Sequence, residues 1–250
     1  MSFKNKTVII TGAGLGIGFE IAKQLSQNGA FIILNDMDEK IGKKAASQLE
    51  NCVFVHGDAG DLTVIKKLID SATSNYGKLD YAIANAGITT FGPFLDYSKE
   101  NLDQLLHVNI QGTFFLAQQA AKVFIEQNSG GRIVMMSSTT GLKPHDELEA
   151  YGMTKAAIAF LAKSLGTQLA PNGITVNCIT PGATRTERTT SVKGYEEGWS
   201  EIIPTRRVAS VEDIAATALF LLSEKAKHIT GQNIIVDGGW SNLGPVPKAI

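Results

Sequence analysis

Tyr151 and Lys155 are the two side chains whose types and spacing point most directly to chemistry. They lie four residues apart in an alanine-rich stretch, so a helix there would place both on one face. An alcohol that is oxidised by hydride transfer must also lose a proton, and the side chain that accepts it must itself be deprotonated. The ammonium group of Lys155 would favour the phenolate form of Tyr151. The pair is therefore predicted to supply the acid/base of a hydride transfer.

Ser138 is the third candidate catalytic residue. It follows the apolar run 132–136, which has the composition of a strand, and it precedes Tyr151 in the chain. Open parallel sheets bind ligands outside the carboxyl ends of their strands, so Ser138 and the helix of Tyr151 can meet in one crevice. We expect the Ser138 hydroxyl to hydrogen-bond to the substrate oxygen and to hold it against Tyr151.

Two segments are predicted to surround the substrate. The loop after Ser138 is polar, and its predicted substrate contacts are Thr140, His145 and Glu149. This polarity favours a hydroxyl-rich substrate such as a sugar or polyol. The stretch 184–207 has no regular pattern, and insertions of that length are more often functional than passive, so we expect a substrate lid there. Tyr195 and Trp199 within it could cover the substrate or anchor the segment to the core.

The elements that must position these residues alternate along the chain. Short runs rich in β-branched residues are separated by longer segments of helical pattern. The runs are almost continuously apolar, as parallel strands buried on both faces should be. They cover residues 7–10, 31–34, 52–55, 80–83, 132–136, 174–177 and 233–236. The pattern predicts an α/β fold, a Rossmann-like doubly wound parallel sheet of seven strands with helices on both faces, in one domain over residues 1–250.

A glycine-rich loop follows the first predicted strand. Residues 11–18 read Thr-Gly-Ala-Gly-Leu-Gly-Ile-Gly and lead into a predicted helix over 17–27. Glycine allows close backbone approach, and a helix N-terminus offers free N–H groups to a phosphate. Phe19 and Glu20 stand where a P-loop needs Lys and then Ser or Thr, which excludes an ATP site of that kind. The predicted cofactor contacts in this loop are Gly12, Gly14, Leu15, Gly16, Ile17 and Gly18.

Asp36, at the end of the second strand, predicts NAD as the cofactor. A carboxylate there can accept hydrogen bonds from both ribose hydroxyls of an adenosine, and it would repel a 2′-phosphate. Met37 supplies no positive charge, and residues 12–18 contain no Lys or Arg. A glycine loop with an acidic second strand also describes an S-adenosylmethionine-dependent methyltransferase, which would leave Tyr151 and Lys155 without a role. A non-catalytic NAD(H)-binding protein is the other alternative that stays open.

Composition excludes several other classes. The 250 residues carry 23 Lys and Arg against 24 Asp and Glu, a formal net charge of -1. Nucleic acids and anionic membranes select basic faces, so neither is a predicted partner. The cysteines and histidines lack metal-ligand spacing, and no metal is predicted. The sequence also lacks the pattern of a signal peptide or a membrane span, and we expect a cytoplasmic enzyme with a small-molecule substrate.

These motifs, in this order, resemble those of the short-chain dehydrogenase/reductase family, and the resemblance covers essentially the whole chain. It implies an NAD-dependent alcohol dehydrogenase or ketone reductase. It also implies a fourth catalytic residue, Asn109, which in the family holds a water that connects the lysine to solvent. The alternative substrates that it leaves open are 3-oxoacyl thioesters and hydroxysteroids.

The resemblance implies further cofactor contacts and an assembly. The contacts are Asp58 and Ala59 at the adenine, Asn85, Ala86 and Gly87 after the fourth strand, and Pro181, Gly182, Thr184 and Thr186 at the nicotinamide carboxamide. Thr184 departs from the Ile or Val that is usual there, and Ala84 replaces an Asn. The assembly is a homotetramer built through two long helices, 109–127 and 151–169, in which Gly152, Ala156, Ala159 and Gly166 would allow close packing.

Overall fold

Parallel strands form the central layer of the molecule. A computed structural model describes residues 2–243 of the chain. Within that range seven strands pair in the order β3-β2-β1-β4-β5-β6-β7, and every pairing is parallel. The strands are β1 (Thr7–Ile10), β2 (Phe31–Asp36), β3 (Cys52–His56), β4 (Tyr81–Ala84), β5 (Gly131–Met136), β6 (Ile174–Pro181) and β7 (Asn233–Val236). The predicted α/β fold is confirmed.

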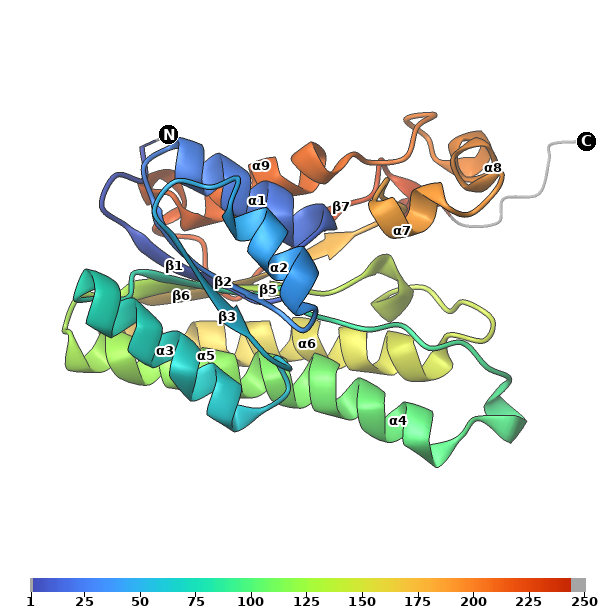
Figure 1. Cartoon of the computed structure of the whole chain (residues 1–250). Coiled ribbons are helices and arrows are strands. Elements are labelled where there is room, and N and C mark those ends of the chain that lie inside the picture. Colours follow the sequence, from blue (N-terminus) through green and yellow to red (C-terminus); the bar gives the residue numbers. More distant parts are fainter. Residues whose placement is uncertain (1, 244–250) are drawn as a thin grey trace, which may run out of the picture.

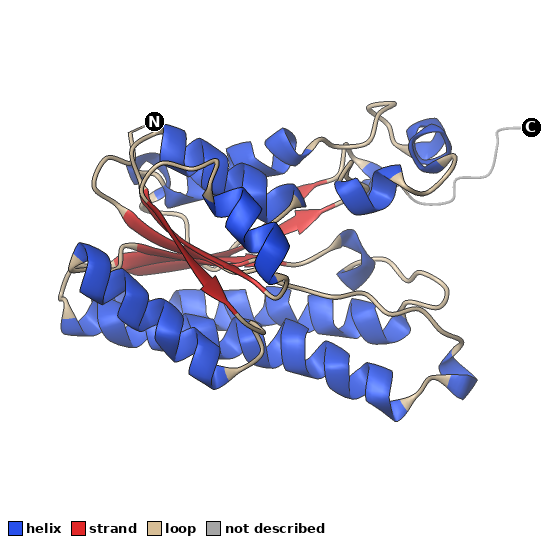
Figure 2. Cartoon of the chain, in the orientation of Figure 1, coloured by secondary structure: helices blue, strands red, loops and turns tan. Residues whose placement is uncertain are grey.

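Helices cover both faces of this sheet (Figures 1 and 2). On one face lie α1 (Gly16–Gln27), α2 (Glu39–Ala46) and α9 (Val211–Leu222). On the other lie α3 (Leu62–Tyr76), α4 (Lys99–Leu105), the π-helical segment η2 (Leu106–Gly112), α5 (Thr113–Glu126) and α6 (Glu149–Gln168). Beyond the end of β6 are α7 (Glu187–Thr190) and α8 (Tyr195–Ile202). The short 3-10 turns are η1 (Phe94–Asp96), η3 (Thr139–Gly141), η4 (Ala170–Asn172), η5 (Glu224–Ala226) and η6 (Trp240–Asn242).

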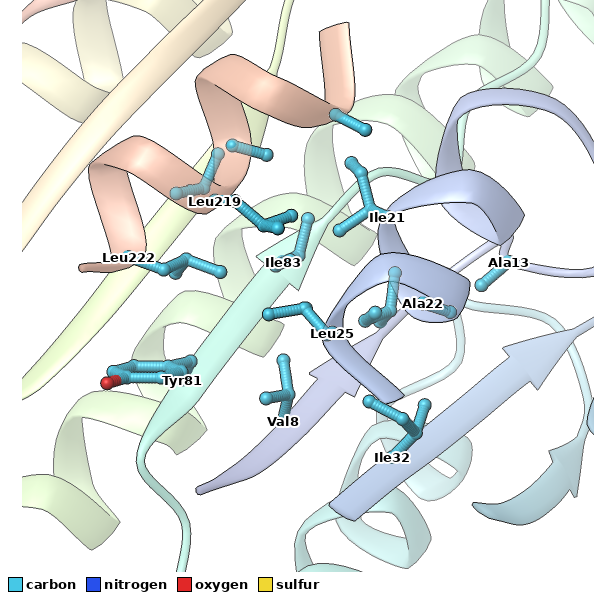
Figure 3. Packing of buried hydrophobic residues seen from close by; sticks show 14 of the residues in the cluster. Val8, Ala13, Ile21, Ala22, Leu25, Ile32, Tyr81, Ile83, Leu219 and Leu222 are labelled. Carbon is cyan, nitrogen blue, oxygen red and sulfur yellow. The ribbon is translucent and has the colours of Figure 1, made fainter. Parts of the chain in front are cut away.

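The two faces of the sheet bury separate apolar cores. Successive side chains of a strand point to opposite faces, so Val8 belongs to one core and Ile9 to the other. In the first core α1 and α9 pack against the sheet, where Leu25 and Leu219 lie close to Ile83 (Figure 3). In the second core α3, α5 and α6 pack against the opposite face. This two-sided burial explains why the strands are continuously apolar in sequence.

Two predictions about helices were wrong in their bounds. The stretch 184–207, expected to be irregular, contains α7 and α8. Thr186 caps α7 by a reciprocal pair of hydrogen bonds with Thr189, a capping pattern that differs from the usual Ser-x-x-Glu. The helix expected to begin at residue 109 belongs to a helical run that starts at Lys99, where Ser98 Oγ accepts from Asn101 N at 3.1 Å.

One strand that leads into the site, β6, is longer than the sequence predicts. β6 continues to Pro181, beyond the predicted end at residue 177, because it is paired with β7 as far as Pro181 opposite Val236. Buried polar residues such as Thr180 interrupt the apolar run in the sequence, although the strand continues through them. Within the described residues, no helix is long and apolar enough to span a bilayer.

Candidate active site

The carboxyl ends of the neighbouring strands β1 and β4 lie at the point where the strand order of the sheet reverses. β2 and β3 extend the sheet on one side of β1, whereas β4 pairs with β1 on the other. Open α/β sheets bind ligands in the crevice outside such a pair of strand ends. The glycine loop 11–18 leaves β1 here, and residues 85–87 leave β4. Both predicted cofactor segments therefore lie at this crevice.

Thr11 and Asn85 tie these two loops together. Thr11 Oγ1 accepts hydrogen bonds from the backbone N–H groups of Asn85 and Ala86, each at 3.2 Å. Asn85 Nδ2 donates to the carbonyl oxygen of Gly12 at 2.8 Å. Gly12 has a φ of +59°, and a Cβ atom there would lie 2.8 Å from Ala86 Cα, so no larger residue fits. Thr11 was not among the predicted site residues, although a hydroxyl directly before the glycine loop could have indicated a role in fixing that loop.

The amino end of α1 is open toward an anionic ligand. In the described structure Leu15 precedes the helix without a side-chain cap, and the first turn carries no acidic residue. Free N–H groups at a helix start attract phosphate. Ile17 packs its side chain against the first core, so only its backbone would be available to a cofactor. These features fit the pyrophosphate of a dinucleotide.

Asp36 lies beside this loop at the end of β2. Its Oδ2 accepts a hydrogen bond from Gly14 N at 2.9 Å, and its Oδ1 accepts from Asp38 N at 3.0 Å. The carboxylate therefore holds the glycine loop as well as facing the crevice, a role that the sequence did not predict. Each carboxylate oxygen can accept a second hydrogen bond, so the group still fits ribose hydroxyls. Met37, next to it, is 69% exposed and uncharged.

The turn Asp58–Gly60 follows β3 and sits next to Asp36 along the same sheet edge. Asp58 Oδ1 accepts from Gly60 N at 2.8 Å, which shapes the turn. His107 Nε2 lies 3.6 Å from Asp58 Oδ2. The carbonyl oxygen of Ala59 faces Gly112, where a Cβ atom would approach it to 2.7 Å. The predicted adenine residues Asp58 and Ala59 are thus packed against the π-helical segment that carries Asn109.

Asn109 is fully buried at the centre of η2. Its Oδ1 accepts from Ile88 N at 2.9 Å, and its Nδ2 donates to Ile88 O and to Thr154 Oγ1, each at 3.1 Å. The side chain therefore joins the loop after β4 to α6. π-helical turns are rare and occur often at functional sites. Thr154 was not predicted as a site residue, although its position directly before Lys155 could have indicated it.

Lys155 is 4% exposed and lies on the inner side of α6. Its Nζ donates to Met136 O at 3.0 Å and lies 5.6 Å from the centroid of the Tyr151 ring. A Cβ atom on Gly87 would lie 3.1 Å from Lys155 Nζ and 3.3 Å from Asn109 Oδ1. Gly87, Asn109 and Lys155 therefore converge at one point next to Tyr151.

Ser138 is brought to α6 by two glycines, one in η3 and one in α6, each of which packs against the backbone of the other element. A Cβ atom on Gly141 would lie 2.7 Å from Ala156 N, and one on Gly152 would lie 2.7 Å from Thr140 O. Ser138 Oγ accepts from Thr140 N at 3.2 Å, which holds the start of η3. The tight contact brings the Ser138 turn onto the first turns of α6, where Tyr151 lies.

Gly152 and Gly166 were expected to pack against a neighbouring subunit, and this expectation was wrong. Gly152 faces Thr140 within the same chain, and a side chain on Gly166 would overlap Gly231. Both glycines serve internal contacts of α6. Ala156 is exposed and Ala159 is half-buried, so these two remain on the outer side of the helix.

The segment after β6 closes the crevice from the opposite side. Gly182 packs against Asp237, and Thr184 Oγ1 donates to Gly182 O at 2.9 Å. Thr184 also pairs with Ala209 in a short parallel bridge, so its hydroxyl and backbone are engaged in local structure. Thr186 lies over the glycine loop, with its Cγ2 3.5 Å from where a Cβ atom on Gly16 would be. The predicted nicotinamide segment thus reaches the glycine loop, and Pro181 ends β6 beneath it.

The three predicted substrate contacts lie together in a different hollow. Thr140, His145 and Glu149 line a groove of about 320 Å³ between the loop after β5 and the outer side of α6. Among the described residues, Ser138 and Tyr151 do not line it. His145 and Glu149 are exposed. The structure therefore groups these residues in a groove beside the candidate catalytic residues, to which Thr140 is joined by its hydrogen bonds with Ser138.

Other features of residues 2–243 offer no competing chemistry. A polar hollow of about 390 Å³ lies at the amino edge of the sheet, and its Lys6 and Asp80 are paired at 2.9 Å. Burial raises the pKa of the Cys178 thiol to about 11 and that of Cys52 to about 12, so neither is an activated nucleophile. No cluster of His, Cys, Asp and Glu within residues 2–243 could hold a metal ion.

Comparisons with known proteins match the whole of this architecture. The family model described as Enoyl-(Acyl carrier protein) reductase matches residues 12–241. The chain is 36% identical over 248 residues to Oxidoreductase UcpA of Salmonella typhimurium, with 94% of each chain covered. It is 31% identical over 252 residues to a diacetyl reductase, (S)-acetoin forming, of Staphylococcus epidermidis, with 94% of this chain and 98% of that one covered. The crystal structure of a 3-ketoacyl-(acyl-carrier-protein) reductase from Brucella melitensis complexed with NADH has a TM-score of 0.90 and 29% identity, with 96% of this chain and 100% of that chain covered.

Proposed function

The chain belongs to the short-chain dehydrogenase/reductase family and is an oxidoreductase of that family, and we propose that it transfers a hydride between NAD(H) and a secondary alcohol or ketone. The observation that carries the proposal is the convergence of Gly87, Asn109 and Lys155 next to Tyr151 at the crevice. A methyltransferase would have no use for this group of residues, and the matched family gives that alternative no support.

Each candidate catalytic residue has a distinct part in the proposed reaction. NAD, when bound, supplies the acceptor of the hydride. Tyr151 takes the proton of the alcohol and returns it in the reverse direction. The Lys155 ammonium, held by Met136 O at 3.0 Å, favours the phenolate. Ser138 holds the substrate oxygen, and Asn109 fixes the loop and helix on either side of Lys155.

The preference for NAD over NADP rests on Asp36. Its negative charge at the end of β2 disfavours a 2′-phosphate, and the neighbouring Met37 offers no compensating charge. The test is the ratio of kcat/KM for NAD and NADP in the wild type and in Asp36→Asn, which keeps an acceptor for Gly14 N. We expect the wild type to prefer NAD and the variant to lose about tenfold or more of that preference. A wild type that prefers NADP would overturn the assignment.

Two substrate classes have support. Hydroxyl side chains at the crevice, such as Thr89, which lies 3.5 Å from Arg188 Nη1, favour a sugar, polyol or similar small hydroxylated substrate. Exposed apolar side chains on the loop after β4 favour a substrate with an apolar body, such as a 3-oxoacyl thioester or a hydroxysteroid. Phe91 is 63% exposed, Phe94 76% and Leu95 91%. The relatives named for diacetyl and 3-ketoacyl reduction act on ketones, which supports the shared reaction.

The deciding experiment follows NADH absorbance with a panel of sugars, polyols, simple secondary alcohols, hydroxysteroids and 3-hydroxyacyl thioesters. Tyr151→Phe is expected to lower kcat by about 10² to 10⁴ and to leave NADH affinity near that of the wild type. Substantial residual turnover in this variant would remove Tyr151 from the mechanism. NADH binding without turnover of any substrate would instead favour a non-catalytic NAD(H)-binding protein.

Three further proposals concern the whole chain. We propose that residues 1–250 work as one NAD-binding and catalytic domain, with 184–207 as the substrate lid, which the contact of Thr186 with the glycine loop supports. We propose a homotetramer, supported by exposed apolar residues on α6, where Met153 is 53% and Phe160 73% exposed. A cytoplasmic location is supported by the two free thiols, which a reducing compartment preserves.

A further inference from the structure

Both tryptophans of the chain meet in one cluster at the edge of the lid. The sequence contains two tryptophans. The Trp199 ring of α8 and the Trp240 ring of η6 are 5.3 Å apart between centroids and 79° apart in plane, which is the favourable edge-to-face arrangement. On another side of Trp199 the His145 ring lies 6.1 Å away. We call His145, Trp199 and Trp240 the aromatic junction.

The aromatic junction joins three segments that are far apart in sequence. Trp199 belongs to the lid, Trp240 to the turn after β7, and His145 to the loop that runs from Ser138 to Tyr151. Lys143 of that same loop lies with its Nζ 4.8 Å from the Trp240 ring centroid and donates to Leu243 O at 2.5 Å. The loop therefore contacts both tryptophans, and the three segments hold one another in a closed cycle.

Trp240 provides a fixed support in this cycle. Asp237, which is 8% exposed, accepts hydrogen bonds from Gly239 N at 2.8 Å and from Ser241 N at 2.7 Å. These bonds shape the turn directly before and after Trp240. Thr205 N, at the end of the lid, donates to Gly238 O at 3.3 Å. The turn is thus braced locally and also carries the end of the lid.

The lid helix has few other contacts, among them that of Tyr195 with the backbone of Thr184. In the described structure no residue of α8 is buried. Its ion pair between Arg185 and Glu196 lies at the surface, where such pairs contribute little stability. A short helix without a buried face depends on its tertiary contacts to stay folded and in place. The aromatic junction supplies such contacts for α8 at Trp199.

We propose that the aromatic junction holds the lid against the loop between Ser138 and Tyr151, which makes Trp199 a positioning residue for the substrate. Trp199 acts through the position of the lid and the loop, and it exchanges no proton or hydride. The consequence for substrate binding rests on the proposed function, whereas the closed position of the lid does not. The two parts are therefore tested separately.

The position of the lid is tested by limited trypsin digestion, which needs no substrate. The lid offers the cleavage sites Arg185, Arg188, Lys193, Arg206 and Arg207. Trp199→Ala is expected to speed cleavage there about three- to tenfold, the population change that corresponds to one aromatic pair. Trp199→Phe keeps a ring and should digest at nearly the wild-type rate. Equal cleavage rates in Trp199→Ala and the wild type would overturn the proposal.

A matched control truncates an aromatic ring elsewhere. Tyr76, at the end of α3, stacks on Phe31 at 4.4 Å between centroids, at the amino edge of the sheet. Tyr76→Ala removes a half-buried ring of comparable size, and we expect it to leave cleavage within the lid unchanged. Faster lid cleavage in this control as well would mean that the effect is general destabilisation, which also overturns the proposal.

The effect on substrate is tested by the kinetic constants. Trp199→Ala is expected to raise KM for the alcohol or ketone about three- to tenfold with kcat and NADH affinity near wild type, and Trp199→Phe should restore KM. Faster lid cleavage with an unchanged KM would overturn the positioning role. If the wild type turns over no substrate of the panel, the proposed function fails, and the digestion result still decides whether the aromatic junction holds the lid.

Discussion

Asn109 contributes to the site through three hydrogen bonds that no other side-chain type can make in the same way. As an amide it accepts from Ile88 N and donates to Ile88 O and Thr154 Oγ1. Its full burial means that water cannot replace these bonds if the side chain is lost. The residue thereby fixes the distance between the loop after β4 and α6, the two elements on either side of Lys155.

Asn109→Ala is expected to lower both stability and turnover. Loss of the amide leaves the part-buried backbone N–H and carbonyl groups of Ile88 without these partners, which costs about 1–3 kcal/mol of unfolding free energy, measurable by urea denaturation. Asn177 is the matched control, because it is 1% exposed, donates to Ile229 O at 2.8 Å and accepts from Gln232 N at 3.0 Å. Asn177→Ala should lose similar stability and keep kcat. Equal kcat values in the two variants would remove Asn109 from the active site.

At the scale of elements, the contact between η3 and α6 decides whether Ser138 and Tyr151 can work on one substrate. The backbones approach so closely at Gly141 and Gly152 that neither position has room for a methyl group. Gly152 lies in the first turns of α6, where alanine would otherwise stabilise the helix by up to about 1 kcal/mol. Steric exclusion at the contact and helix propensity therefore act in opposite directions at this position.

Gly152→Ala is expected to lower kcat, because the added methyl group pushes Thr140, and with it Ser138, away from α6. Gly166→Ala is the matched control on the same helix, since its methyl group would overlap Gly231 far from Ser138. Both variants should lower the melting temperature, and Gly152→Ala alone should lower kcat when both are assayed well below that temperature. Unchanged kcat in Gly152→Ala would show that the contact does not set the Ser138 position.

The start of α9 gives the molecule an acid-sensitive contact. Ser210 and Asp213 form reciprocal capping hydrogen bonds, and Arg207 forms a two-pronged ion pair with Asp213. The Arg207 guanidinium lowers the pKa of Asp213 from 3.8 to about 2. A lowered pKa in the folded state means that the contact stabilises fully above the unfolded value near 3.8 and is lost as the pH falls toward about 2.

Asp213→Asn should therefore lower the melting temperature at neutral pH, with a gap to the wild type that closes between pH 3.8 and about 2. A thermal unfolding series across this pH range measures the gap. Asp70→Asn, an exposed substitution on α3, controls for the general loss of negative charge. A gap that stays constant down to pH 2 would contradict the role of the Asp213 carboxylate.

The elements that the sequence predicts well are those whose stability comes from local pattern. The central strands are buried apolar runs, and Asp36 and Ser138 could be located because Asp36 ends one strand and Ser138 lies two residues after another. The π-helical segment around Asn109 has no local sequence signature, and its position against the turn at Ala59 is a contact between segments that are distant in the chain. The inward packing of Gly152 could not be predicted either, because a glycine in a helical sequence does not indicate which neighbouring segment packs against it.

At the scale of the whole molecule, the outer sides of α5 and α6 carry apolar side chains that the internal cores do not use. Met153 and Phe160 on α6 lie two helical turns apart on one side, and Phe114 on α5 is 41% exposed. Both helices cover the same face of the sheet (Figure 1). Apolar side chains collected on one face of a molecule mark an interface between proteins.

Phe160→Glu tests the proposed homotetramer. A carboxylate placed within an apolar interface costs several kcal/mol of association free energy, so the variant is expected to dissociate into smaller species, as measured by light scattering after size-exclusion chromatography. Lys163→Glu alters the charge on an exposed position of the same helix and should leave the assembly intact. Ser138, Tyr151 and Lys155 all come from one chain, so the dissociated Phe160→Glu protein should still bind NADH. A wild type and variant of equal mass would exclude Phe160 from an interface between subunits.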